Sequence, residues 1–325
     1  MWESDASRLL DPCCVACRHE RLRGLLRPTA VATDYAPLLH HLVQQRTPSR
    51  LYELQQCLFG VLVNDDPYWG IYDCVQCPTC RRYLHVLAID GQMIAIIDHV
   101  VRKLYPLLDA QAPDDLVFRS ATPQEQEGAR RRLAKAVFRQ PTDITEDPMP
   151  VLGTTPYAWL TEAMLSAYAF LVIHETSHQG PQAALGAAHY WPLVATAQAG
   201  AAKRGITLGT GQADAWAREL HADLNAVLIM RTDAFQLIKP QVAVPYGRAL
   251  LAGVALALGV WDLILREYCY GNALLTTQLV RTHPPASFRI ESLRTNMAIA
   301  AELQAFAGDT LWAERVLDAL SDLHG

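Results

Sequence analysis

Apolar stretches of helical length, separated by Gly, Pro and polar residues, follow one another through the second half of the chain. This pattern predicts helix after helix from Pro156 onwards. The expected helices cover residues 156–178, 186–203, 211–231, 244–268 and 285–307, with a short one at 309–323. No internal repeat accompanies them. The fold class is therefore expected to be mainly α.

The first half of the chain has a different pattern. Residues 34–63 are expected to be largely helical, whereas residues 83–105 are apolar and fit either a strand or a helix. A charged helix from Gln124 to about Phe138, expected to present a solvated face, precedes two Pro-containing breaks. We therefore expect three parts: a cysteine-rich region at 1–106, a linker with a charged helix at 107–150, and a helical domain at 151–325.

Composition narrows the classes of function. Hydrophobic residues make up 51% of the 325 positions and the formal net charge is −5, which gives no electrostatic reason to propose nucleic acid as the main partner. The first residues contain acids and no apolar run, so they do not form a secretory signal, and a cytoplasmic location is expected. The longest apolar run, Ala249–Trp261 with Leu263–Leu265, is shorter than the roughly 20 residues of a membrane span. It is expected to form a buried core helix, with membrane contact not favoured; the oligomeric state is not indicated.

Seven of the eight cysteines fall within residues 1–105, mostly in close C-x-x-C spacing. Such spacing without a secretory signal favours metal binding over disulfides. Two pairs, Cys14/Cys17 and Cys77/Cys80, can form a four-thiolate structural zinc site, and Cys77–Arg81 resembles a zinc-ribbon knuckle. Cys13 and Cys74 are rival ligands, and reduced thiols without metal are the alternative.

The segment Ala167–Gly180 contains the motif H-E-x-x-H at His174, Glu175 and His178. Residues four apart share a helix face, so the two imidazoles can bind one zinc ion. Glu175 lies between them and can act as general base on the zinc-bound water.

A catalytic zinc needs a third protein ligand. A third histidine at metzincin spacing would fall on Ala184, which excludes that class, and neither His189 nor His221 has a supporting motif. Glu219 is the better candidate. Asp223 lies four residues later on the same helix face, where it can hydrogen-bond a ligand histidine and fix its tautomer.

Three blocks together resemble the gluzincin zinc peptidases: HExxH at 174–178, ExxAD at 219–223, and THPxxxxRI at 282–290. The order matches that of the heat-shock and CAAX-processing membrane peptidases and of the soluble Lit-type phage-exclusion peptidases. The resemblance covers about residues 156–295. Clear spanning helices, which the membrane peptidases carry, are missing here, so the soluble branch is preferred.

The resemblance implies that His174, His178 and Glu219 bind zinc and that Glu175 activates water. It implies that His283 donates to the developing oxyanion or shapes the turn before the next helix, and that Arg289 pairs with Asp223 or another carboxylate. The expected function is hydrolysis of a peptide bond in a selected protein substrate, in phage defence or stress response. The alternative is a non-catalytic scaffold that recruits a partner through its cysteine region.

Overall fold

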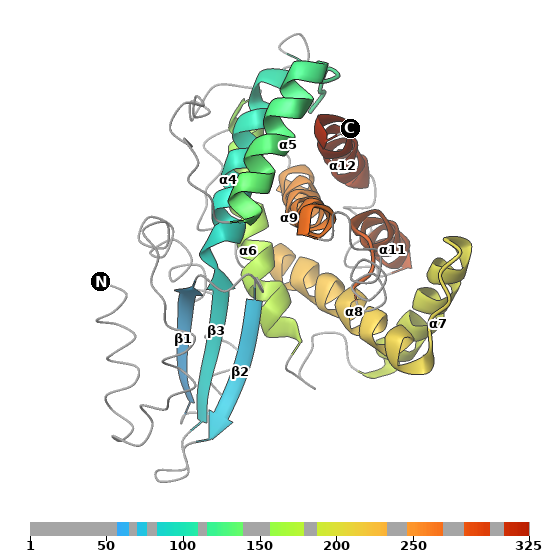
Figure 1. The fold of residues 1–325 in the computed structure, drawn as a ribbon. Coiled ribbons are helices and arrows are strands. Elements are labelled where there is room, and N and C mark those ends of the chain that lie inside the picture. Colours follow the sequence, from blue (N-terminus) through green and yellow to red (C-terminus); the bar gives the residue numbers. More distant parts are fainter. Residues whose placement is uncertain are drawn as a thin grey trace.

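The computed structural model describes residues 57–64, 70–76, 83–109, 116–138, 157–178, 187–232, 246–268, 283–299 and 309–324. Helices dominate this part of the chain, so the protein is mainly α, as expected (Figure 1). A small sheet precedes the helices. Cys13, Cys14, Cys17, Cys77 and Cys80 lie outside the described residues, and so does the predicted zinc-ribbon site.

Three strands form the sheet, in the order β1-β3-β2. Strand β1 (Cys57–Asn64) pairs in parallel with β3 (Tyr83–Asp90), and β2 (Gly70–Gln76) pairs antiparallel with β3. The expected helix over residues 34–63 is therefore wrong for β1. Its short, continuous apolar run suits a strand in a parallel pair, and hydrophobic periodicity alone does not separate such a run from a buried helix.

The ambiguous segment 83–105 contains both kinds of element. Strand β3 ends at Asp90, and helix α4 (Gly91–Leu104) begins at the next residue, followed by a short 3-10 turn, η4 (Tyr105–Leu107). The buried residues of α4 recur at helical spacing: Met93, Ile96, Ile97, Val100, Val101 and Leu104. One apolar face therefore directs α4 onto the core.

Helix α5 (Pro123–Val137) is the predicted charged helix. Thr122 and Glu125 form a reciprocal capping box at its start, and Pro123 occupies the first turn, where no backbone donor is lost. The expectation that this helix is solvated is wrong for one face, because Ala129, Leu133 and Ala136 are buried in the main core. The described part of segment 107–150 thus packs on the helices that follow it.

Helix α9 (Tyr246–Tyr268) runs through the centre of the helical layer, with α6 (Tyr157–Ser177) and α12 (Thr310–His324) packed along it (Figure 1). A Cβ atom built on Gly253 of α9 would lie 2.5 Å from the carbonyl oxygen of Ala163 and 2.8 Å from the amide nitrogen of Ala167. The backbones of α6 and α9 approach this closely because Gly253 has no side chain.

The apolar run of α9 is a core segment, as expected. Among the described residues, one helix is long and apolar enough to cross a bilayer, over Gly247–Glu267, and 78% of its most apolar window is buried inside the protein. A buried core helix of a water-soluble protein meets the same criteria.

A second, smaller core joins α7 (Ala187–Lys203), α8 (Thr210–Thr232) and α11 (Ala286–Ile299). Phe288 of α11 packs against Trp216 of α8, with 5.3 Å between the ring centroids. Gly205 has a φ of 70° just after α7, which allows the chain to turn towards α8. This core fixes α8 and α11 relative to each other. The predicted helices of the second half therefore correspond to α6, α7, α8, α9, α11 and α12, with ends that differ by one or two residues where both are described; residues 300–307 of the helix predicted over 285–307 lie outside the described residues.

Candidate metal centre

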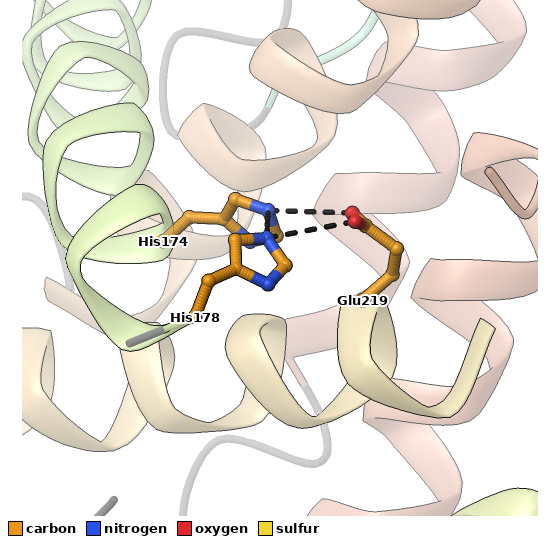
Figure 2. Close-up of side chains that lie close together, drawn as sticks. All are labelled: His174, His178 and Glu219. Carbon is orange, nitrogen blue, oxygen red and sulfur yellow. Dashed lines mark hydrogen bonds and ion pairs between the residues drawn. The ribbon is translucent and has the colours of Figure 1, made fainter. Parts of the chain in front are cut away.

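The H-E-x-x-H motif lies at the end of α6, with His174 in its last turn and His178 just after it. Glu219 projects from α8 towards the same point (Figure 2). The side chains of His174, His178 and Glu219 are 7%, 25% and 13% exposed, respectively. The group is therefore mostly enclosed, and its more open side lies at His178.

Three atoms of this group converge closely enough to bind one ion. The two imidazole Nε2 atoms are 3.0 Å apart. Nε2 of His174 lies 3.4 Å from Oε2 of Glu219, and Nε2 of His178 lies 3.5 Å from Oε1 of the same carboxylate. Ligand bonds of 2.0–2.1 Å at tetrahedral angles separate ligand atoms by roughly 3.3 Å. His174, His178 and Glu219 could thus hold a metal ion. Sequence reasoning chose these three residues, and the structure brings them together.

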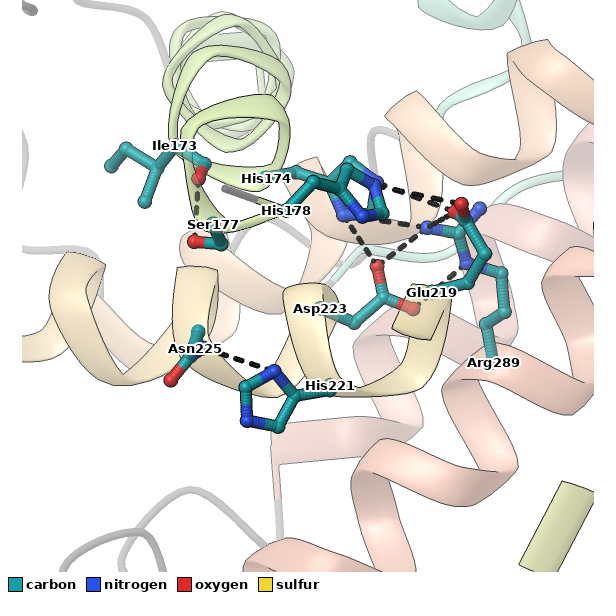
Figure 3. A network of polar contacts seen from close by, with 9 residues as sticks. All are labelled: Ile173, His174, Ser177, His178, Glu219, His221, Asp223, Asn225 and Arg289. Atoms are coloured by element: carbon teal, nitrogen blue, oxygen red, sulfur yellow. Dashed lines mark hydrogen bonds and ion pairs between the residues drawn. The ribbon is translucent and has the colours of Figure 1, made fainter. Parts of the chain in front are cut away.

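Asp223, one turn after Glu219 on α8, contacts the other nitrogen of His174, with 3.0 Å between Nδ1 and Oδ1 (Figure 3). The carboxylate accepts a hydrogen bond there, so in the neutral imidazole, the form that binds metal, Nδ1 carries the proton and Nε2 directs its lone pair towards Glu219 and His178. A hydrogen bond of this kind fixes the tautomer and orientation of a metal-binding histidine. The contact expected from the four-residue spacing of Glu219 and Asp223 is present.

Arg289 of α11 completes a buried network. Its Nε donates to one oxygen of Asp223 at 2.8 Å, and a terminal nitrogen donates to the other oxygen at 2.6 Å. Its terminal nitrogen also lies 3.4 Å from Glu219. The Arg289 and Asp223 side chains are 3% and 1% exposed, so this bidentate pair is buried away from solvent. The pairing of Arg289 with Asp223 that the resemblance implies is present.

The carboxylates around His174 favour positive charge at this point. Burial alone would lower the pKa of His174, but the hydrogen bonds that its ring donates to Asp223 and Glu219 outweigh this effect and raise the pKa to about 9. Burial and the neighbouring His174 lower the pKa of His178 to about 4. Burial would likewise raise the pKa of Glu219, but His174 and Arg289 hold it well below its usual range. The surroundings therefore stabilise one added positive charge between the three ligand atoms.

Glu175 differs from Glu219 in its electrostatic setting. Burial raises its pKa to about 7; the negative charge of Glu219 adds to this effect, and the charges of His174 and Arg289 oppose it. A carboxyl group with a pKa near neutrality can both take up and release a proton at physiological pH. A dication nearby would shift this equilibrium towards the carboxylate.

His283 lies three residues before the start of α11, with its ring centroid 5.6 Å from that of Trp261 of α9. Burial lowers its pKa, and the charges of Glu219, Arg289 and His174 act on it as well. His283 therefore belongs to the electrostatic surroundings of the centre. Helix α11 begins directly after Pro284 and Pro285, as the sequence indicates.

His221, one of the alternative ligands, is not part of this group. His221 faces away from it on α8, towards Tyr190 and Asn225, with 3.4 Å between the Asn225 amide nitrogen and the imidazole Nδ1 (Figure 3). The side chain of His189 is outside the described residues. Cys74 lies in β2 opposite His85 of β3, and the side chains of both are outside the described residues.

Sequence reasoning missed one residue of the surroundings, Asp262. It lies on α9 and accepts a hydrogen bond from the backbone nitrogen of Ala286 at 2.9 Å. The signal was a single carboxylate inside the apolar run of α9. Because α9 and α11 are separated by 17 residues, that signal does not reveal which backbone group Asp262 contacts.

No protein-family model, curated protein or solved structure matches this chain. The geometry and electrostatics of the centre formed by His174, His178 and Glu219 therefore carry the functional argument.

Proposed function

We propose that the chain is a zinc-dependent endopeptidase that hydrolyses a peptide bond in a selected protein substrate. One observation carries the proposal: the Nε2 atoms of His174 and His178 and the carboxylate of Glu219 converge with separations of 3.0–3.5 Å. Three protein ligands at this spacing leave a fourth tetrahedral position for a water molecule or substrate, as catalytic zinc sites do.

Two imidazoles and one carboxylate form a donor set typical of zinc peptidases and less suited to calcium or magnesium, which prefer oxygen ligands. When bound in such a site, zinc polarises a carbonyl group and lowers the pKa of a water molecule to about 7. The carboxylates of Glu219 and Asp223 outnumber the guanidinium of Arg289, so the group favours an added cation.

Glu175 is suited to serve as general base and then as acid. Its pKa, raised by burial to about 7, lies near the working pH, which favours proton transfer in both directions. The base would take a proton from the attacking water and give it to the leaving amine. A scaffold protein would have no need of a carboxyl group at this position.

The remaining residues act on orientation and charge. Asp223 holds His174 in the tautomer whose Nε2 is free to bind metal, and Arg289 holds Asp223 through two hydrogen bonds. His283 is the candidate donor to the oxyanion. The resemblance to Lit-type peptidases supports a role in phage defence or stress response. The proposal further includes a cytoplasmic enzyme with few targets, whose C-x-x-C pairs bind a structural zinc ion.

Proteome-wide labelling of new protein termini, after expression of the wild type and of Glu175→Gln, tests the proposal. The wild type should generate a small set of new termini, and Glu175→Gln should bind zinc normally and generate none. Glu162→Gln is the matched control, because Glu162 is also a partly buried carboxyl on α6 with a raised pKa but lies outside the metal group. The same new termini in the wild type and in Glu175→Gln, or no new termini in either, would favour the scaffold.

A further inference from the structure

Asp262 is the only charged residue in the apolar segment Ala249–Leu265 of α9. It is partly buried, and burial raises its pKa. A carboxyl group placed among apolar residues is costly unless hydrogen bonds or charges compensate it. Its partners therefore indicate why it is there.

The hydrogen-bond partner is the first residue of α11. Oδ2 of Asp262 accepts from the backbone nitrogen of Ala286 at 2.9 Å. The first four backbone N–H groups of a helix lack acceptors within the helix, and a Ser, Thr, Asp or Asn directly before the first turn usually supplies one side-chain acceptor for them. Here that place is taken by Pro285, whose side chain has no acceptor. Asp262 thus caps α11 from another helix, and its negative charge suits the positive end of the helix dipole.

The first turn of α11 carries the residues that reach the metal group. The backbone nitrogen of Arg289 bonds to the carbonyl of Pro285 at 3.0 Å, within the turn that Asp262 caps. The Arg289 side chain then reaches Asp223 and Glu219. Asp262 also contributes to raising the pKa of Arg289, which places its charge near the guanidinium.

A neighbouring contact holds the residue before the helix. Trp261, adjacent to Asp262 on α9, packs its ring against His283 at 5.6 Å between centroids. Two consecutive residues of α9 therefore contact both ends of the short segment 283–286. That segment sets where His283 and Arg289 stand relative to Glu219.

We propose that Asp262 is a positioning residue of the metal centre: by capping α11 it holds Arg289 on Asp223, and through Asp223 it orients His174. Its importance for catalysis rests on the proposed function, whereas its effect on Arg289 does not. The two claims can therefore fail separately.

The direct readout is the Nε–H proton of Arg289, followed by NMR in chain labelled with ¹⁵N-arginine and assigned with Arg289→Lys. In the wild type Nε donates this proton to Oδ2 of Asp223, with 2.8 Å between the nitrogen and the oxygen, so its exchange with water should be slow. In Asp262→Ala the exchange should accelerate by about tenfold, as expected for loss of a helix cap. Asp262→Asn should restore slow exchange, because Asn caps helices as well as Asp does.

The matched control is Asp322→Ala. Asp322 of α12 also accepts a hydrogen bond from a distant backbone nitrogen, that of Ala121 two residues before α5, but it does not belong to the metal group. Asp322→Ala should leave the exchange rate of the Arg289 Nε–H proton unchanged. If Asp262→Ala does not fold, Asp262→Leu removes the acceptor while keeping the volume, and the same measurement applies.

Unchanged exchange in Asp262→Ala, or equal acceleration in Asp322→Ala, would overturn the proposal. Zinc affinity, measured by competition with a chelator, should fall by about tenfold in Asp262→Ala and stay at the wild-type value in Asp322→Ala. A wild-type chain that binds zinc and cleaves no substrate would remove the proposed peptidase function and leave the positioning role of Asp262 standing.

Discussion

The two halves of α6 are both buried but lie in opposite surroundings. The first half packs apolar and small residues on α9 and α12: Trp159 stacks on Trp312 with 4.5 Å between ring centroids, and Ala163 and Ala167 face Gly253. The second half ends in His174 and His178, which face the carboxylates of α8 and, behind them, Arg289 of α11. One helix therefore joins an apolar core to a charged centre.

The two regions depend on different physical terms. The apolar half is stabilised by removing surface from water and by close packing, so changes in volume matter most there. The charged half contains buried ions that are costly to desolvate and stable only as a complete set. Substitutions in the first half should lower stability and leave metal binding intact, whereas substitutions in the second should affect both.

The largest effect is expected for Arg289→Met. Removing the guanidinium leaves the buried carboxylate of Asp223 without its bidentate partner, so the free energy of unfolding should fall by about 3–5 kcal/mol. Urea denaturation in the presence of a chelator measures this change without a contribution from metal. On the same helix, Arg294→Met breaks an exposed pair with Glu314 and should cost less than about 1 kcal/mol. Equal losses in the two variants would contradict the contrast between the two regions.

The next largest effect is expected for Gly253→Ala, at the position on α9 that faces the apolar half of α6. The new Cβ would meet the backbone of α6, so the helices must separate, and the free energy of unfolding should fall by about 2–3 kcal/mol. Gly128→Ala on α5 is the control: a Cβ there meets nothing within 4 Å, and stability should rise by about 0.5–1 kcal/mol. Zinc affinity of the folded chain should be the same in both variants. A Gly253→Ala protein as stable as the wild type would show that the contact between α6 and α9 is looser than described.

A smaller effect is expected on the pH dependence of stability, and it follows from the contrast between two buried histidines. Carboxylates raise the pKa of His174, whereas burial, with some contribution from Arg266 and Arg130, lowers the pKa of His324 on α12 to about 4. The fold therefore favours neutral His324. The contribution of this preference to the free energy of unfolding is present above pH 6.5 and is lost as the pH falls from about 6.5 towards 4. Between pH 7 and 5 the wild type should lose about 1 kcal/mol more stability than His324→Gln. Parallel stability curves for the two proteins would show that His324 does not titrate in this way.

The same contrast explains what could be predicted from the sequence. The helices of the second half could be predicted because helical spacing places residues three and four apart on one face, and the same rule pairs His174 with His178 and Glu219 with Asp223. These inferences depend on local geometry, which the order of residues encodes directly. That the two pairs meet was inferred from the need of a catalytic zinc for a third ligand and from the order of the three sequence blocks, and the structure brings Asp223 to His174.

What could not be predicted depends on contacts between distant segments. β1 was expected to be helical because an apolar run of this length fits either element, and only its pairing with β3 decides between them. The buried face of α5 depends on α4, α9 and α12. The cap that Asp262 provides for α11 depends on the way in which α9 and α11 meet. Spacing along the chain carries little information of this kind.

Whether His174, His178 and Glu219 bind one zinc ion together can be decided by comparing the zinc content of the wild type with that of Glu219→Ala. The two proteins are purified in parallel, dialysed against dilute zinc and measured by elemental analysis. The difference between the two proteins matters, because a zinc ion bound by the cysteine region would count equally in both. Glu219→Ala is expected to hold one zinc ion fewer per chain than the wild type. Equal zinc content in two folded proteins would show that His174, His178 and Glu219 do not share an ion.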